Sequence, residues 1–335
     1  MKSLLQHQIQ PNAHNSDLQM IRVLFTGGGG AGNEALFRLL GQHYILHFGD
    51  ADITAIDPGI PETRRHQLPL ASSPNFACKI KELCSRLGID VLIPGVDEEL
   101  LALALNDETL APTRLLLPNS DYTEMMLDKL KMIRALSAKQ IPVPLSQALD
   151  DDTEWIEFPC ISKPRSGRGS RNVKFHKNLT ELEALRTSLG SFAPQFLVQK
   201  KIIGVEYTVQ MIANEEGFLV AVVPVKVEVK RGITVRAETE AETRVIATCR
   251  AIHNAMPTKG IYNIQLMLTP AGDVFPFEIN PRISTTLCLV VAAGIDPIAA
   301  YLGDAHHKKL LPFTSGIKLK RHWKNFFQEA CEKTQ

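Results

Sequence analysis

Short apolar runs and helically spaced apolar residues alternate along residues 21–120. The run at 21–26 predicts a strand, the glycines after it predict a turn, and the spacing of apolar residues up to 44 predicts a helix. Further strands are expected at 53–57, 89–94 and 115–118, and further helices at 76–87 and 98–105. Strands that alternate with helices form parallel, doubly wound sheets, so this region is expected to be α/β.

The pattern changes after residue 120. One helix is predicted over 121–140, with a cap near Ser120 and an end before Pro142, and it would link two regions. The later apolar runs are short and β-rich, apart from a helix expected near 179–189. Turn sequences at 214–217 and 270–273 predict two hairpins. The second half of the chain is therefore expected to be α+β.

Composition narrows the function classes. The chain has 335 residues, 44% hydrophobic and 22% charged, with a formal charge of only +1, so nothing indicates a nucleic-acid or membrane-surface binder. The apolar runs are too short to span a bilayer. Residues 1–20 lack the apolar core of a signal peptide and are expected to form a disordered extension. Six cysteines without a CxxC pair favour a reducing, cytoplasmic location.

Gly27, Gly29 and Gly32 form a GxGxxG pattern between a predicted strand and a predicted helix. With Asp57 at the end of the next predicted strand, this pattern raises the question of a nicotinamide dinucleotide site. Asp57 follows Gly32 by 25 residues, rather than the roughly 20 that are typical, and no hydride-transfer site is evident. A turn that lets the backbone pass tightly, or that offers its N–H groups to an anion, is the favoured interpretation.

A basic, glycine-containing loop runs from Lys163 to Arg171 between two predicted strands. A lysine at a strand end, followed by flexible N–H donors, can hold a phosphate group. The loop is not a Walker A motif, because it leads into a strand rather than a helix. The alternative is a solvated basic turn.

The hairpin near 270–273 places polar side chains together. If its turn is centred between Ala271 and Gly272, Gln265 faces Glu278 and Asn263 faces Asn280. Alternation then puts Gln265, Glu278 and Asn280 on one face, and it puts Ile264, Phe277 and Ile279 on the other. One carboxylate and two amides suit Mg²⁺ when phosphate oxygens complete its shell, and Arg282 could lie beside a transferring phosphoryl group. A polar, solvent-facing strand is the alternative.

Taken in order, the segments with candidate chemistry resemble the motifs of the ATP-grasp superfamily. These segments are Asp128-Lys129, Ile141-Pro-Val-Pro144, Ile161-Ser-Lys-Pro164, Phe196-Leu-Val-Gln199, Gly204-Val-Glu206-Tyr207, Asn263-Ile-Gln265 and Glu278-Ile-Asn-Pro-Arg282. Within the superfamily, the chain resembles stand-alone proteins related to the carbamoyl-phosphate synthase large subunit, of the carboxylate–amine ligase kind. The similarity runs from about residue 21 to about residue 319.

The resemblance implies a domain organisation. After the extension, residues 21–120 would form a pre-grasp α/β domain. Residues 121–200 would form the central, or lid, subdomain of the ATP-grasp fold, and residues 201–335 its C-terminal subdomain. The two subdomains would clamp ATP between them.

The resemblance also implies the site residues. ATP would contact Lys129, Lys163, Gly167, Arg168, Gly169, Ser170, Gln199, Lys200, Ile202 and Glu206. Mg²⁺, or Mn²⁺ in its place, would be held by Gln265, Glu278 and Asn280. Arg282 would be catalytic, and Arg231 and Arg236 would face the substrate. Two positions depart from the family pattern: Lys200 stands where relatives carry an acidic residue, and Asn172 stands where they carry glycine.

The implied function is an ADP-forming carboxylate–amine ligase that works through an acyl phosphate. One alternative is a bicarbonate-phosphorylating enzyme of the carbamoyl-phosphate synthase kind, although one ATP-grasp unit is fewer than that synthase has. Another is a regulatory protein that binds ATP without chemistry. The expected partners are small-molecule carboxylates and amines, with no nucleic acid and no membrane, and a homodimer is left open.

Overall fold

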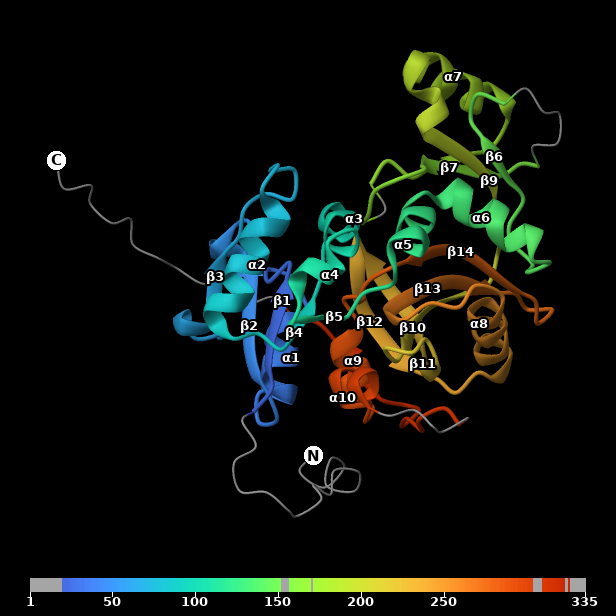
Figure 1. Ribbon diagram of the computed structural model, residues 1–335. Coiled ribbons are helices and arrows are strands. Elements are labelled where there is room, and N and C mark those ends of the chain that lie inside the picture. Colours follow the sequence, from blue (N-terminus) through green and yellow to red (C-terminus); the bar gives the residue numbers. More distant parts are fainter. Residues whose placement is uncertain (1–19, 152–156, 170, 304–308, 323–324, 326–335) are drawn as a thin grey trace.

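The computed structural model describes residues 20–151, 157–169, 171–303, 309–322 and 325. The expected N-terminal extension therefore lies outside the described residues, apart from Met20. Figure 1 shows three sheets, with the first in blue beside the six-stranded sheet and the four-stranded sheet at the upper right. The mixed α/β and α+β class expected from the sequence is confirmed.

The first sheet is parallel, in the order β3-β2-β1-β4-β5. Its strands are β1 (Arg22–Thr26), β2 (Ile45–Asp50), β3 (Arg65–Gln67), β4 (Val91–Ile93) and β5 (Arg114–Leu115). The helices between them are α1 (Asn33–Leu40), η1 (Ile53–Ala55), η2 (Glu62–Arg64), α2 (Phe76–Leu87), α3 (Asp97–Ala104) and α4 (Asp107–Leu110). The strand predicted at 53–57 is wrong: β2 ends at Asp50, and a 3₁₀ turn capped by the Asp52 side chain follows.

The predicted helix 121–140 is two helices, α5 (Ser120–Leu127) and α6 (Lys129–Ala138). The break lies at Asp128, whose extended backbone is incompatible with a continuous helix. Its carboxylate accepts the N–H groups of Leu130 and Lys131 and so caps the second helix. A strong N-cap inside an apolar pattern therefore restarts the helix and aims Lys129 from its first position.

The second sheet is antiparallel, in the order β6-β9-β7-β8. Its strands are β6 (Ser146–Ala148), β7 (Cys160–Pro164), β8 (Lys174–His176) and β9 (Phe196–Lys200). Helix α7 (Leu179–Leu189) has the predicted bounds, since Asn178 caps its start, and η3 (Gly190–Gln195) follows it.

The third sheet is also antiparallel, in the order β14-β13-β10-β11-β12-β15. Its strands are β10 (Val205–Ala213), β11 (Leu219–Arg231), β12 (Ile233–Thr239), β13 (Gly260–Leu268), β14 (Val274–Asn280) and β15 (Lys318–Lys320). The remaining helices are α8 (Thr243–Ala255), α9 (Leu287–Ala292) and α10 (Pro297–Leu302). Both predicted hairpins are present, as β10–β11 and β13–β14.

The β13–β14 register is the predicted one where it matters. Gln265 faces Glu278 and Asn263 faces Asn280. Nearer the turn the pairing is offset by one residue, and a bulge around Phe277 restores it. The expectation that Phe277 lies on the opposite, apolar face is wrong, because this extra residue lets its side chain line the same cavity as Glu278.

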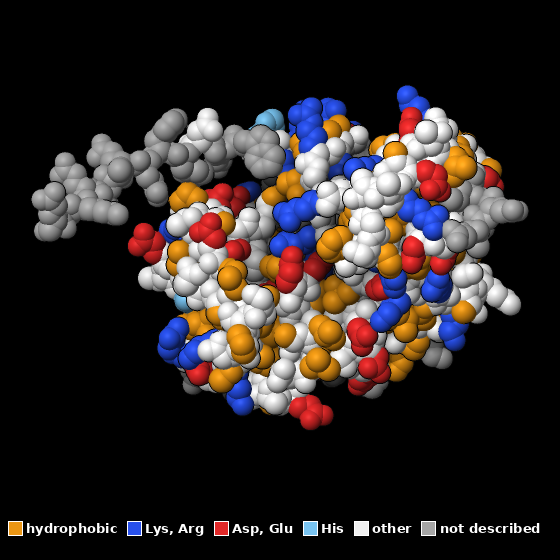
Figure 2. Space-filling view, turned by 90° about the horizontal axis from the view of Figure 1, so that it is seen from above, with side chains coloured by type: hydrophobic (Ala, Val, Ile, Leu, Met, Phe, Trp, Pro, Cys, Tyr) orange, Lys and Arg blue, Asp and Glu red, His pale blue; other side chains and the backbone are white. Residues whose placement is uncertain are grey.

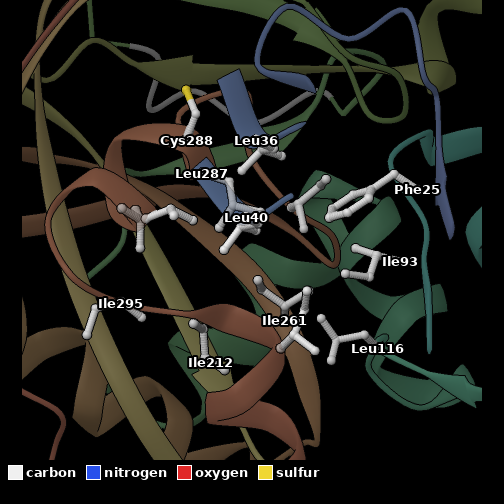
Figure 3. Packing of buried hydrophobic residues seen from close by; sticks show 14 of the residues in the cluster. Phe25, Leu36, Leu40, Ile93, Leu116, Ile212, Ile261, Leu287, Cys288 and Ile295 are labelled. Carbon is white, nitrogen blue, oxygen red and sulfur yellow. The ribbon is translucent and has the colours of Figure 1, made fainter. Parts of the chain in front are cut away.

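Buried apolar residues join the parallel sheet to the six-stranded sheet. Figure 3 shows Phe25 and Ile93 from the first sheet, Leu36 from α1, and Ile212 and Ile261 from the six-stranded sheet within one cluster. A second cluster holds α5 and α6 against β10, β13 and β14, so these two helices pack on the six-stranded sheet. Within the described residues, no helix is long and apolar enough to cross a membrane.

Candidate functional site

Two adjoining cavities, of about 1120 and 710 Å³, run along the six-stranded sheet. The first lies between this sheet and the four-stranded sheet, and the second lies between it and the parallel sheet. The residues that line both are Glu98, Arg168, Arg171, Lys230, Gln265 and Glu278. In Figure 2 lysine and arginine side chains gather near the middle of the face seen from above, with acidic side chains among them. The two cavities therefore meet at a polar junction.

The first cavity collects most of the residues that the resemblance assigns to ATP. Those that line it are Lys129, Lys163, Gly167, Arg168, Gln199, Lys200, Ile202 and Glu206. Gly169 lines the second cavity, and Ser170 lies outside the described residues. The structure thus brings together, from four separate segments, a set that the sequence order alone only suggests.

Lys163 and Lys129 point at the junction from different elements. The Lys163 ammonium is buried, donates to the Phe277 carbonyl at 3.2 Å and lies 5.2 Å from the centre of that ring. Burial lowers the pKa of Lys163 to about 8; Glu278 opposes this shift, whereas Lys129 and Lys230 add to it. Lys129 donates to the Gly167 carbonyl at 2.7 Å and lies 3.3 Å from Glu278. An anion that enters here meets several cations in a water-poor setting.

Asp128, the capping residue of α6, also holds the start of the basic loop at 163–171. Asp128 accepts hydrogen bonds from the Arg165 guanidinium, the shorter at 2.6 Å, and the Lys129 N–H donates to the Arg165 carbonyl at 2.8 Å. Beyond Arg165 the chain opens out, since a Cβ added at Gly167 or Gly169 would meet nothing within 4 Å. The loop is therefore anchored at Arg165 and through the Gly167 carbonyl, while the space beside its two glycines is open.

Strand β9, which lies between β6 and β7 in the four-stranded sheet, presents the residues expected near an adenine. The Lys200 N–H donates to the Leu145 carbonyl, and its ammonium pairs with Glu157 at 2.5 Å. Gln199 donates through its side chain to the Ser146 hydroxyl at 2.8 Å. Lys200 thus has an acidic partner within the chain.

Lys230 is a site residue that the sequence reasoning missed. Its ammonium donates to Glu206 at 2.5 Å and to the Gln265 side-chain oxygen at 3.0 Å. The predicted substrate residues Arg231 and Arg236 are exposed and line neither cavity. Because neighbouring side chains on a strand point to opposite faces, alternation could have separated Lys230 from Arg231.

The candidate metal ligands lie at the junction or beside it. Gln265 and Glu278 line both cavities, whereas Asn280 is buried on the side of the second cavity and donates to Asn263 at 3.2 Å. Arg282 also lines the second cavity, where its guanidinium pairs with Asp97 at the start of α3. That pair joins the hairpin to the parallel sheet across 185 residues of sequence.

The glycine turn after β1 is tightly packed. A Cβ on Gly29 would lie 2.7 Å from the Ala55 Cβ, and one on Gly32 would lie 2.9 Å from the Thr285 carbonyl oxygen. The acidic residue at the end of β2 is Asp50, which accepts the Gly29 N–H at 2.9 Å. These contacts support the interpretation that the glycines allow close passage of the backbone.

Glu99, in the first turn of α3, is a second residue that the sequence reasoning missed. It is 3% exposed and lines the second cavity. Its Oε1 accepts hydrogen bonds from the N–H groups of Gly95 and Val96 and from the Thr26 hydroxyl. Burial raises the pKa of Glu99 to about 7, the hydrogen bonds oppose this shift, and the charge of Asp50 adds to it.

Comparison with known proteins identifies the fold. Residues 126–286, just under half of the chain, match the family model of the ATP-grasp domain, which confirms the resemblance seen in the sequence over that stretch. No curated protein sequence matches the chain.

Solved structures extend the likeness over most of the chain. An N5-carboxyaminoimidazole ribonucleotide synthetase solved with ADP gives a TM-score of 0.64 at 12% identity, over 89% of this chain and 79% of that one. The L-amino acid ligase of Bacillus licheniformis gives 0.63 at 16% identity, over 83% and 72%. Pyruvate carboxylase of Rhizobium etli gives 0.62 at 16% identity over 84% of this chain, which spans 28% of that protein. At these identities the likeness shows the fold.

Proposed function

We propose that the protein is an ATP-dependent, ADP-forming ligase that joins a carboxylate to an amine through an acyl phosphate. The observation that carries this proposal is the junction, because Gln265, Glu278 and Lys230 line both cavities. A nucleotide in the first cavity and an acceptor in the second would therefore meet at one set of polar side chains. The ATP-grasp match and the similarity to an L-amino acid ligase support this class of reaction.

In this proposal the first cavity binds ATP. Lys129, Lys163 and Arg168 supply positive charge for the phosphates, and Glu206 is placed for the ribose hydroxyls. The loop glycines, which are open to solvent, allow the loop to close over the phosphates. The other nucleotide contacts proposed from the resemblance are Gly167, Gly169, Gln199, Lys200 and Ile202, with Ser170 outside the described residues.

Gln265, Glu278 and Asn280 fit a magnesium ion that the nucleotide brings. Together they offer one carboxylate and two amide oxygens, and phosphate oxygens would complete the shell. Within the described residues no group of three or more His, Cys, Asp or Glu side chains could hold a metal, which agrees with binding that depends on the nucleotide. When bound, the ion would neutralise phosphate charge; Mn²⁺ would accept the same oxygens.

The chemistry that follows is positioning and charge neutralisation. A carboxylate oxygen attacks the γ-phosphorus and ADP leaves; an amine nitrogen then attacks the acyl carbon and phosphate leaves. Arg282 lies on the side of the second cavity, where the incoming carboxylate would be, and Asp97 fixes its guanidinium. Arg231 and Arg236, placed outside both cavities, have no contact in this sequence of steps.

The test is ADP release from MgATP with pools of carboxylates and hydroxylamine, which traps an acyl phosphate as a hydroxamate. Glu278→Gln should lower carboxylate-dependent ADP release on the order of 10³-fold, because it removes the carboxylate at the phosphoryl group. Its melting temperature should stay close to that of the wild type. Glu108→Gln makes the same chemical change at an exposed position outside both cavities and serves as the control. Wild-type ADP release by Glu278→Gln would contradict the assignment.

A further inference from the structure

The second cavity contains two carboxylates that pair with no cation in the part of the chain that the structure describes. Three of the four cations that line it have an acidic partner: Arg282 pairs with Asp97, Arg168 lies 3.4 Å from Glu98, and Lys230 donates to Glu206. The fourth, Arg171, lies at the junction and has no acidic partner among the described residues. Within the described residues, Asp50 and Glu99 line this cavity and have no cationic partner. The acidic floor at the carboxyl edge of the parallel sheet therefore suits a positively charged group.

Glu99 is the buried member of this floor, and its hydrogen bonds show which oxygen is available. Gly95 and Val96 donate to Oε1 at 3.1 and 3.0 Å, and the Thr26 hydroxyl donates to the same atom. Oε2 accepts no hydrogen bond within the described residues, while the side chain lines the cavity. The carboxylate is thus held by one oxygen, and the other can meet a ligand.

We propose that the second cavity binds an amine substrate and that the Oε2 atom of Glu99 accepts the proton that the amine nitrogen loses as the C–N bond forms. This inference rests on the ligase function proposed above and adds where its amine binds and which side chain takes the amine proton. Asp50 supplies further negative charge for the same group. The Glu278 junction and Glu99 line one continuous cavity, so the acyl phosphate and the amine can meet within it.

The proton balance is complete with this base. The amine arrives largely protonated at neutral pH and releases one proton to solvent on reaching its reactive form. Its lone pair attacks the acyl carbon, and the nitrogen becomes positively charged. Glu99 takes one N–H proton, the C–O bond to the phosphate breaks with its electron pair, and the proton passes to the departing phosphate or to water. The products are an amide and inorganic phosphate.

The environment of Glu99 suits this role. Thr26 on β1, the N–H groups of Gly95 and Val96 before α3, and Asp50 on β2 are the polar and charged groups that face it. Burial and the charge of Asp50 favour its protonated form, so its proton affinity exceeds that of an exposed carboxylate.

The experiment separates the two halves of the reaction. Hydroxylamine, largely unprotonated near pH 7, reports acyl-phosphate formation, and a panel of amino acids and short diamines, read by mass, reports amide formation. Glu99→Gln should keep hydroxamate formation within about threefold and lower amide formation at least 30-fold. Glu108→Gln, at an exposed position that lines neither cavity, should change neither product. Raising the pH to 9, where more amine is unprotonated, should restore part of the loss.

Each other outcome counts against part of the argument. Equal loss of both products in Glu99→Gln would make Glu99 a support of α3, and no loss of either would place the base elsewhere; both overturn the inference alone. No hydroxamate from the wild-type protein with any carboxylate would remove the ligase function and this inference with it. If Glu99→Gln does not fold, Asp50→Asn should raise the KM for the amine at least tenfold with unchanged hydroxamate formation, and an unchanged KM would overturn the inference.

Discussion

The two glycine-containing loops of the cleft differ in what a side chain would meet. Around Gly27–Gly32, beside the second cavity, added Cβ atoms would meet the backbone or side chains at about 3 Å. At Gly167 and Gly169 they would meet nothing within 4 Å. Gly32 has an ordinary negative φ of −108°, whereas Gly169 has a φ of +73°. Gly32 is therefore needed for space and Gly169 for its backbone conformation, while Gly27, with a φ of +63°, is needed for both reasons.

The loop at 27–32 is tightly packed, whereas the loop at 163–171 has open space beside its glycines. The first loop passes between η1 and the segment before α9, so it fixes the floor on which Asp50 and Glu99 lie. The second loop is held by Arg165 and by the hydrogen bond from Lys129 to the Gly167 carbonyl, and no atom fills the space beside its glycines. Substitutions in the first loop should therefore act on stability, and substitutions in the second should act mainly on nucleotide binding.

The largest effect is expected at Gly32. Gly32→Val should lower the free energy of unfolding by roughly 4 kcal/mol, because its methyl groups enter the space of the Thr285 carbonyl oxygen, 2.9 Å from the Cβ position. Gly32→Ala should cost less, and thermal unfolding of both variants measures the order. Equal melting temperatures for Gly32→Val and the wild type would show that this loop is not packed as described.

Glu99 should make the stability of the protein depend on pH. Its pKa of about 7 exceeds that of an exposed glutamate, so the folded state keeps a proton that the unfolded chain has lost. Stability should therefore fall as the pH rises from about 4.5 to about 7, by an amount on the order of 3 kcal/mol.

Glu99→Gln has no such proton and should lack this fall. Its melting temperature relative to that of the wild type should thus be higher at pH 8 than at pH 5. Parallel pH profiles for the two proteins would show that burial does not raise the pKa of Glu99.

Substitutions in the loop at 163–171 should lower the stability less than those at Gly32. Gly169→Ala should lower the free energy of unfolding by about 1 kcal/mol, since only the strain of a positive φ opposes it. Gly169→Asn should cost less, because asparagine tolerates the left-handed region. Calorimetry should show ATP binding weakened by roughly threefold to tenfold in Gly169→Ala. A stability loss as large as that of Gly32→Val would remove the distinction between the two loops.

The sequence predicts best those helices and strands that have a clear apolar period and a capping residue. Helices 76–87 and 179–189 were predicted with the observed bounds, because Gly88 ends the first in a left-handed conformation and Asn178 caps the second. The pairing of Gln265 with Glu278 was also predicted, although the bulge at Phe277 offsets a shorter turn. The strand pairing at a site can therefore be predicted correctly even when the geometry of the adjoining turn is not.

The features of the site that the sequence does not predict depend on contacts between segments that are distant in the sequence. The sequence pattern points to Asp57 as the acidic residue at the end of the second strand, because the apolar stretch at 53–57 predicts a strand there. The second strand is instead at 45–50, and the acidic residue at its end is Asp50. The pair between Arg282 and Asp97 spans 185 residues, and the burial of Glu99 follows from the packing of α3 on β1. No periodicity in a single segment contains this information.

The smallest effect is expected at the end of the open loop. Asn172 has a φ of +59°, in the left-handed region that glycine adopts most easily. Since asparagine is the residue that best tolerates this region after glycine, Asn172→Gly should change the free energy of unfolding by no more than about 0.5 kcal/mol and leave the ATP dissociation constant nearly unchanged. Asn172→Val should cost more than 1 kcal/mol, because a β-branched residue is a true outlier there. Unfolding and ATP titration of the pair check this order. If Asn172→Gly tightened or weakened ATP binding as strongly as Gly169→Ala weakens it, the exit of the loop would control nucleotide binding as much as its glycines do.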